Sequence, residues 1–419
     1  MATENAIVPV HFQRHSDFKH ALDAAKNAYF QQKGITPYAT TTMYSKVVFF
    51  NISWIASWIV LNFVATSPSA VALTYVWLAL SIVGKGFNVL HDGGHSAFAP
   101  KKQNWINEIT SADADTIGLS SWAWWWKHRI LHHQLTNIPG ASGDPDVGLE
   151  PIGLLAPTSK PHWWYRLQWL YLPIAYLLLV WKMHWWDDMV SIIKGKVRGR
   201  TVPRPAGWKL TLFWGGKGFF ITWAFIIPLI IQLHRGTSFT RAVGLILISY
   251  AIIAAIVGFT LAMIFQLAHC VREAEHPLPT SGDSIEMPTD AITHQFATSV
   301  GFCHYRPLRH HFGRYLSRMF RFTPGMHRFT LATMIGGNIK NWLMTQYMGG
   351  LNFQDWHHAF PDVAHDRLPG LARAMRRVLR RYGVQNRVMH SFTWAVISHF
   401  LFLWDMSKQS QRVPVEDMM

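Results

Sequence analysis

The chain has 419 residues, of which 50% are hydrophobic, only 15% are charged, and 21 are Trp. Ordinary soluble domains carry about 25% charged residues, and Trp favours the membrane–water interface, so this composition argues against a soluble protein. The formal charge of +16 fits either nucleic-acid binding or a basic membrane protein. Two cysteines, Cys270 and Cys303, exclude a disulfide framework and fit a reducing compartment.

Taken in chain order, the first expected element is a short amphipathic helix over 18–34 ("FKHALDAAKNAYFQQKG") within a polar N-terminal arm, 1–44. We expect no cleavable signal peptide, because the first forty residues contain no apolar core segment. A membrane-spanning helix needs about 20 apolar residues. Four stretches meet this length and form two hairpins, 45–90 and 210–268, with spans predicted at 46–65, 70–90, 210–232 and 242–268.

A fifth apolar stretch, 163–186, is interrupted by Pro173 and framed by Trp. We expect an interfacial or partly sunken helix here and not a span, which leaves an even number of crossings. The two short loops between the spans carry only Arg235 and Arg241, so the positive-inside rule places all the larger parts in the cytoplasm. The basic runs 194–209 and 367–383 are expected to be solvated faces beside anionic headgroups.

The predicted fold class is therefore an all-α membrane protein with about four transmembrane helices and a cytoplasmic helical cap. The cap comprises 91–209, with the interfacial helix, and the C-terminal part, 269–419.

Histidines gather on one side of this topology. "HDGGH" (91–95) follows the second span, "HRILHH" (128–133) lies in the cap, His269 ends the fourth span, and "QDWHH" (354–358) lies in the C-terminal part. On a helix, residues four apart are stacked neighbours, so two such imidazoles can address one metal ion. A single zinc uses four ligands, a haem uses one or two axial His, and soluble di-iron bundles use Glu-x-x-His pairs that are missing here. The pattern predicts an all-imidazole site for two metal ions.

These three His boxes, in this order and on this side of the membrane, resemble those of the membrane fatty acid desaturases over residues 30–380. Gln in the first place of the third box, within "GGLNFQDWHHAFP", is similar to the front-end or linoleoyl-CoA desaturase branch. The resemblance implies a four-span fold whose cap holds two irons, with an acyl tunnel beneath them. It implies eight metal ligands: His91, His95, His128, His132, His133, His269, His357 and His358. All of them except His269 are also the expected catalytic residues.

Two further residues are weaker candidates. Gln354 stands where relatives often have His, so it is expected to ligate weakly, bind through water or orient a neighbour. His294 recurs in bacterial relatives of the family. Asp92, Asp144 and Asp146 are candidates to hold the imidazoles from outside, or else are solvated or capping carboxylates.

The implied reaction is the O2-dependent removal of two hydrogens from adjacent methylenes of a fatty acyl chain, carried by CoA, a carrier protein or a lipid. Because the chain contains no HPGG motif of a fused cytochrome b5, the electrons are expected from a separate ferredoxin or cytochrome b5 with its reductase. Membrane lipids are the other expected partners. A bacterial inner membrane is favoured over the endoplasmic reticulum.

Other functions stay open at this point. A hydroxylase on the same scaffold would need the same residues, while a membrane zinc hydrolase would need fewer ligands. A transporter with His relays would place its His within the spans, and nucleic-acid binding leaves the spans unexplained.

Two segments have two interpretations each. The segment 303–340 makes the chain between His294 and Gln354 longer than the family leads us to expect. Its His310 and His311 match no His box, so we interpret the segment as a basic surface insertion. Such an insertion could dock an acyl carrier or the phosphates of CoA. The Trp-rich run 120–128 is expected to seat the second box at headgroup level or to wall the tunnel mouth.

Overall fold

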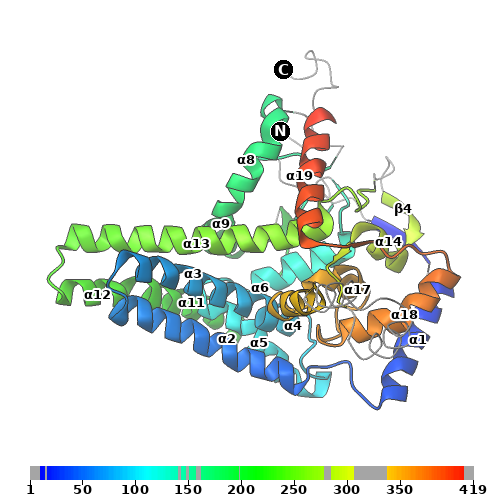
Figure 1. Ribbon diagram of the computed structural model, residues 1–419, viewed down its shortest axis with the longest axis horizontal. Helices are drawn as coiled ribbons and strands as arrows, with labels where there is room; N and C mark the ends of the chain where they lie inside the picture. The colour runs from blue at the N-terminus through cyan, green and yellow to red at the C-terminus, as the bar shows by residue number, and fades with distance from the viewer. Residues whose placement is uncertain are drawn as a thin grey trace, which may run out of the picture.

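The computed structural model describes residues 10–14, 17–139, 143–147, 151–156, 162–197, 199–277, 285–305 and 337–409. Long apolar helices lie side by side and form one end of the molecule, while shorter helices gather at the other end as a cap (Figure 1). The predicted all-α membrane fold with about four spans is confirmed. His310 and His311 lie outside the described residues.

Within the part of the chain that the structure describes, four helices are long and apolar enough to cross a membrane, and they form two hairpins. Their bounds, Thr41–Val64, Pro68–Gly94, Trp208–His234 and Phe239–His269, differ from the predicted ones by at most five residues. The first turn is tight because Ser67 caps the second span, accepting a hydrogen bond from the Ala70 N–H at 3.2 Å, and Pro68 opens it.

Three of the four spans contain a π-helical turn, in which the backbone is wound more loosely than in an α-helix. In chain order the spans consist of α2 (Thr41–Ile59) and η1 (Val60–Val64); α3 (Pro68–Lys85), η2 (Gly86–Leu90) and α4 (His91–Gly94); α11 (Trp208–Ile221), η8 (Thr222–Ile226) and α12 (Ile227–His234); and α13 (Phe239–His269).

The cap is built from the N-terminal helix, the segment between the two hairpins and the C-terminal part. Its helices are α1 (Asp17–Lys33), η3 (Lys101–Gln103), α5 (Asn104–Thr116), α6 (Ser121–Trp124), η4 (Trp125–His132), α7 (His133–Leu135), η5 (Trp163–Leu167), α8 (Gln168–Ala175), η6 (Tyr176–Leu178), α9 (Leu179–Lys182), η7 (Met183–Asp187), α10 (Asp188–Lys194), α14 (Ala291–Thr298), η9 (Leu351–Phe353), α17 (Gln354–Ala359), α18 (Leu368–Arg381) and α19 (Phe392–Gln409). Residues 337–347 are also helical.

The described residues form three two-stranded sheets, of which two join parts of the cap that are distant in the chain and one is a local hairpin. β1 (Val10–Gln13) pairs in parallel with β4 (Ile285–Asp290), β2 (Lys196–Val197) pairs antiparallel with β3 (Arg200–Thr201), and β5 (Gly301–Phe302) pairs in parallel with β6 (Val388–Met389). The predicted N-terminal helix is confirmed as α1, and Gly34 follows it with φ +61°, a left-handed conformation that favours glycine.

Buried ion pairs join the spans to the cap. Lys85 Nζ lies 3.2 Å from Asp113 Oδ1 on α5. Lys217 Nζ lies 2.7 Å from Asp188 Oδ2 on α10 and also donates to the carbonyl oxygens of Gly118 and His184, at 2.6 and 2.8 Å. Since charges are costly among apolar helices, these pairs specify where α5 and α10 meet the spans.

Replacing Lys217 with Met should leave the buried Asp188 carboxylate without its cation, with only the Ser120 N–H still donating to Oδ2, and should remove this donor from two carbonyl groups. Removing one partner of a buried pair costs about 3–5 kcal/mol, so the melting temperature in detergent should fall by many degrees. Lys209→Met is the matched control, because Lys209 is exposed at the start of the same helix. Equal melting temperatures for the two variants would contradict this account.

Candidate metal centre

The four His-bearing segments meet where the spans enter the cap. His91 and His95 follow the π-turn η2, and His128 and His132 lie within the π-turn η4. A π-turn spreads consecutive residues differently around the axis than an α-helix does, and such turns are frequent at functional sites. The α-helical spacing assumed for the second box was therefore wrong, although its imidazoles still converge.

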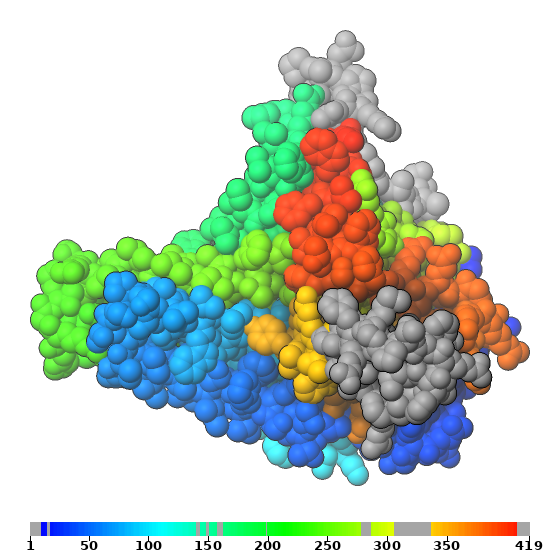
Figure 2. Space-filling model, viewed as in Figure 1, coloured from blue at the N-terminus to red at the C-terminus, as the bar shows by residue number. Residues whose placement is uncertain are grey.

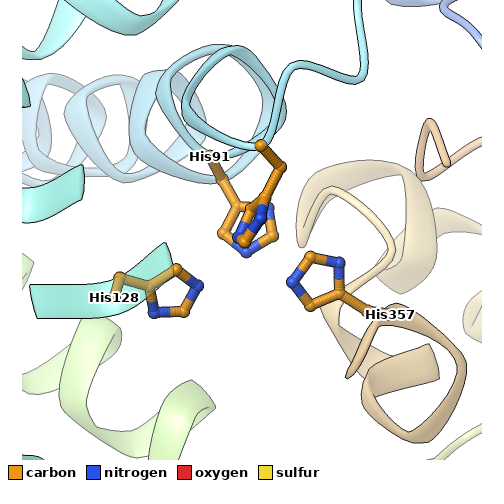
Figure 3. A group of neighbouring side chains, drawn as sticks. His91, His128 and His357 are labelled. Carbon is orange, nitrogen blue, oxygen red and sulfur yellow. The ribbon is translucent and has the colours of Figure 1, made fainter. Parts of the chain in front are cut away.

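The first cluster combines His91, His95, His128 and His357, all buried. One ring nitrogen from each lies within 4.8 Å of the others. The His91 ring centroid is 4.8 Å from that of His95 and 4.4 Å from that of His357. Figure 3 shows the rings of His91, His128 and His357 pointing toward a common centre from three separate segments.

The second cluster combines His132, His269 and His358, again buried and with ring nitrogens within 4.8 Å of one another. His133 lies between the two clusters. Its Nε2 is 3.2 Å from His357 Nε2, and its ring stacks on His358 with centroids 4.1 Å apart. The structure therefore brings together all eight predicted histidines as two adjacent groups.

The outer nitrogens of several rings are held by hydrogen-bond acceptors. His132 Nδ1 lies 2.9 Å from Asp144 Oδ2, and His91 Nδ1 lies 3.3 Å from Asp92 Oδ1. His358 Nδ1 lies 2.8 Å from Gln295 Oε1, and His269 Nδ1 lies 3.3 Å from the Thr298 carbonyl oxygen. Each contact sets the tautomer that leaves the other nitrogen unprotonated and directed inward.

Three carboxylates were predicted to hold the imidazoles from outside, and two of them, Asp92 and Asp144, contact imidazoles directly. Asp146 is less directly placed: its Oδ1 lies 2.5 Å from Lys127 Nζ, and its Oδ2 lies 3.6 Å from His132 Nδ1. It also forms a third possible metal-binding group with His128 and His132.

The two weaker candidates lie differently. Gln354 is buried beside the second cluster, with its Nε2 3.2 Å from His269 Nε2. The amide nitrogen and oxygen of Gln354 have nearly the same shape, so the side chain fits equally well when flipped. In the flipped orientation its Oε1 would face His269 Nε2 in place of Nε2. His294 Nε2 lies 2.9 Å from the Thr136 carbonyl oxygen, to which it donates, and His294 belongs to neither cluster.

Three residues of the site were not found from the sequence. Gln295 joins two boxes, because its Nε2 donates to the His133 carbonyl at 2.7 Å while its Oε1 faces His358. Asn137, with φ +57°, donates to the carbonyl oxygens of His269, Glu275 and Thr298 at 3.0–3.1 Å. His365 holds Asp92 Oδ2 through Nδ1 at 2.9 Å. Asn137 and His365 follow a box by a few residues, which was the available signal, whereas Gln295 lies far from every box; the partners of all three are distant in the chain.

The electrostatics fit metal binding. Burial, followed by neighbouring imidazoles, holds the pKa of His95, His128, His133, His357 and His358 well below its ordinary value, so their lone pairs stay free at neutral pH. At His132, burial lowers the pKa, but Asp144 outweighs it and the net shift is upward.

Several buried atoms of the site have no hydrogen-bond partner among the residues that the structure describes: His91 Nε2, His95 Nδ1 and Nε2, His128 Nε2, His133 Nδ1, His358 Nε2 and Gln354 Oε1. Leaving a buried polar atom unpaired costs about 1–3 kcal/mol, so a concentration of them in one place needs a ligand. Metal ions would satisfy them together, and more imidazoles are present than the four ligands of one zinc.

Fold and site define a class: an all-helical membrane protein with a buried imidazole centre where its spans meet a cap. Residues 66–388 match the family described as fatty acid desaturase, and the chain belongs to that family. It is accordingly an oxidoreductase of lipid metabolism that desaturates fatty acyl chains.

Named relatives cover the chain almost from end to end. It is 25% identical over 413 residues to an sn-1 linoleoyl-lipid 6-desaturase of Arthrospira platensis, which covers 98% of each chain. It is 25% identical over 401 residues to a Synechocystis protein of the same name, covering 96% of this chain and 98% of that one. An acyl-lipid (8-3)-desaturase of Physcomitrium patens is 24% identical over 389 residues, 92% of this chain and 71% of the relative.

Asp144→Asn should weaken metal retention about 10–100-fold, because the amide no longer stabilises the correct His132 tautomer. The measurement is metal content after dialysis against graded chelator concentrations. Asp362→Asn, an exposed carboxyl in the cap, is the control and should behave as the native chain. Indistinguishable chelator curves for both variants would show that Asp144 does not support the centre.

Proposed function

We propose that this chain introduces a C=C bond into a fatty acyl chain carried by a membrane lipid, using two iron ions, O2 and electrons from a separate donor. The observation that carries the proposal is the pair of buried clusters of imidazoles with unpaired nitrogens. The substrate class is supported by the relatives, whose names specify linoleoyl-lipid or acyl-lipid substrates.

The proposed ligands follow the two clusters. His91, His95, His128 and His357 would hold one iron; His132, His269 and His358 the other; and His133 lies within reach of both. Gln354 completes the second set directly or through water. We assign His294 a supporting role, since its Nε2 proton is used on Thr136. Imidazole suits iron, and the number of donors exceeds what zinc uses.

Bound iron would supply the O2-dependent oxidation of an unactivated methylene pair. The chain's own contribution is positional: the clusters are rigidly held and buried, which excludes bulk water, and the acyl chain must present one carbon pair to them. If oxygen transfer competed with removal of the second hydrogen, the product would be an alcohol. Hydroxylation is therefore the second candidate.

An apolar cavity of about 290 Å³ between the spans is the proposed site for the methyl end of the acyl chain. On the second span it is lined by Val71, Tyr75, Leu78, Ile82 and Gly86, a length of about 22 Å along the helix. Gly86 begins the π-turn that ends just before His91, so the cavity starts close to the first cluster. A long cavity below the metals suits a double bond placed near the carboxyl end.

Ala254→Leu should narrow this cavity, because Ala254 is a buried lining residue on α13. In competition between 18-carbon and 14-carbon acyl lipids, the preference for the longer chain should fall about tenfold. Since the readout is a ratio, partial loss of folded enzyme does not affect it. Ala251→Leu, on the exposed side of the same helix, should leave the ratio unchanged; an unchanged ratio in both variants would exclude the cavity as the tail site.

The proposed donor is an acidic redox protein that docks on α18. Five arginines are exposed along this helix: Arg373, Arg376, Arg377, Arg380 and Arg381. Its opposite face, with Leu371 and Met375, packs in one apolar cluster with Trp356, the residue before His357. α18 lies at the end of the molecule opposite the tips of the spans (Figure 1), which favours a water-side protein partner over the lipid headgroups expected from sequence.

Arg377→Glu with Arg380→Glu should lower turnover with a plant-type [2Fe–2S] ferredoxin about tenfold at low ionic strength, through slower association. Reduction of the enzyme by a small chemical reductant should stay normal. Lys101→Glu with Lys102→Glu, exposed on η3, is the control pair. If the α18 variant supports ferredoxin-driven turnover as well as the control, the donor binds elsewhere.

In keeping with the positive loops, we propose that the cap and its site face the cytoplasm, in a bacterial inner membrane. The direct test of function is mass spectrometry of lipids after incubation of the iron-loaded protein with acyl lipid, O2 and reduced donor. A product lighter by two hydrogens, absent with His357→Ala, supports desaturation. A hydroxylated product would establish the second candidate, and unaltered lipid with an iron-loaded, reducible enzyme would overturn both.

A further inference from the structure

A pair of helical segments protrudes from the side of the cap (Figure 1). The helices from η5 to η7 and the C-terminal helix α19 run next to each other, across the direction of the spans (Figure 1). Figure 2 shows them protruding as one ridge, with α19 in red. We call this pair the paddle; it comprises residues 163–187 and Phe392–Gln409. Neither the metal clusters nor the proposed donor surface uses it.

The inner faces of the two arms hold each other. The ring centroids of Trp169 and Trp404 lie 5.4 Å apart, and Gln168 Nε2 donates to the Leu403 carbonyl at 3.3 Å. The Tyr176 hydroxyl lies 3.0 Å from His399 Nε2, while His399 Nδ1 donates to the Cys270 carbonyl at 2.7 Å. The paddle is thus a fixed part of the fold, joined to the end of α13.

The outer face of the first arm is apolar and open. Its side chains recur every three or four residues, so they form one stripe, and over half of the surface of each is exposed: Leu167 53%, Leu170 53%, Ile174 60%, Leu178 64% and Trp181 52%. Trp163 and Trp186, exposed at either end, are the residue type enriched at the membrane–water boundary. A stripe of this kind on a monomer marks a contact with a membrane or a partner.

The position of the paddle relative to the hydrocarbon core decides whether a membrane or a protein partner covers the stripe. It crosses α13 at Gly258, where an added Cβ would lie 2.9 Å from the Tyr176 carbonyl oxygen. Gly258 lies eleven residues before the end of α13 at His269, about 16 Å along the helix. With 31 residues α13 is about 46 Å long, whereas the hydrocarbon core is only about 30 Å thick. If the excess length lies on the cap side, the crossing falls at the edge of the core.

We propose that the outer face of the paddle lies within the cap-side leaflet, as a monotopic element parallel to the membrane surface, and that its occupant is lipid acyl chain. The surface is continuous with the lipid-facing sides of the spans, to which Gly258 joins it. This extends the interfacial helix expected over 163–186 to a two-helix unit in which α19 supports the embedded arm.

The embedded arm has a second consequence, which rests on the proposed function. Val180 and His184 line the acyl cavity, while Leu178 and Trp181 on the same turns face outward. The depth of the paddle therefore fixes one wall of the cavity relative to the leaflet from which a lipid-borne substrate comes. The membrane contact itself is independent of catalysis and is testable without turnover.

The experiment attaches a nitroxide spin label to Ile174→Cys or Leu178→Cys in the full-length protein in phospholipid vesicles. The two native cysteines are buried, which limits background labelling. Collisions with apolar O2 and with a water-soluble Ni(II) chelate are then compared. Phe49→Cys, exposed on a span, is the lipid reference, and Arg373→Cys on α18 is the water reference.

Both paddle labels should resemble the Phe49 label, with O2 contact several-fold above that of the chelate. Chelate contact equal to that of Arg373 would place the stripe in water and overturn the proposal. Labels inaccessible to both reagents would mean that protein, such as a second copy of the chain, covers the stripe, which also overturns it. Because no turnover is measured, failure of the desaturase proposal would leave this result unaffected.

Discussion

The structure depends on eight clustered imidazoles, seven of them buried and His133 half-buried, and several have an inward nitrogen without a hydrogen-bond partner among the described residues. A fold does not retain such a cluster without compensation, because each unpaired buried atom destabilises it. The surrounding acceptors direct these nitrogens to common points: Asp92, Asp144, Gln295 and the Thr298 carbonyl each hold an outer nitrogen. Bound metal would complete this arrangement, so the clusters and their supports form one unit.

The rest of the molecule positions that unit relative to the membrane. Two spans end directly in residues of the His clusters, since His91 belongs to the second span and His269 is the last residue of α13. The ion pairs of Lys85 and Lys217 fix α5 and α10 against the spans. Asn137 then ties the second box to the end of α13 through the His269 carbonyl, and it also donates to the carbonyl groups of Glu275 and Thr298. The apolar cavity lies between the spans, while α18 packs in one cluster with Trp356 of the third box at the end of the molecule opposite the span tips (Figure 1).

Much of this could be predicted from sequence. Spans are long runs of one residue class, so hydropathy placed all four within five residues of their ends. His boxes are local patterns, and their shared side of the membrane predicted that they meet. Asp92 and Asp144 were recognisable as carboxylates near boxes. The contacts that were not predicted join residues distant in the chain: Gln295 with His358, His365 with Asp92, and α19 with α8. The π-turns also escaped, because they depend on packing and not on a residue pattern.

The central claim is that two irons occupy the two clusters. The most direct measurement is iron content by elemental analysis of anaerobically purified protein, for the native chain, His91→Ala and His269→Ala, with His234→Ala at the exposed far end of a span as control. We expect about two irons per chain in the native protein and the control, and a loss of iron in each cluster variant. A single zinc per chain, or iron content unchanged by both substitutions, would contradict it.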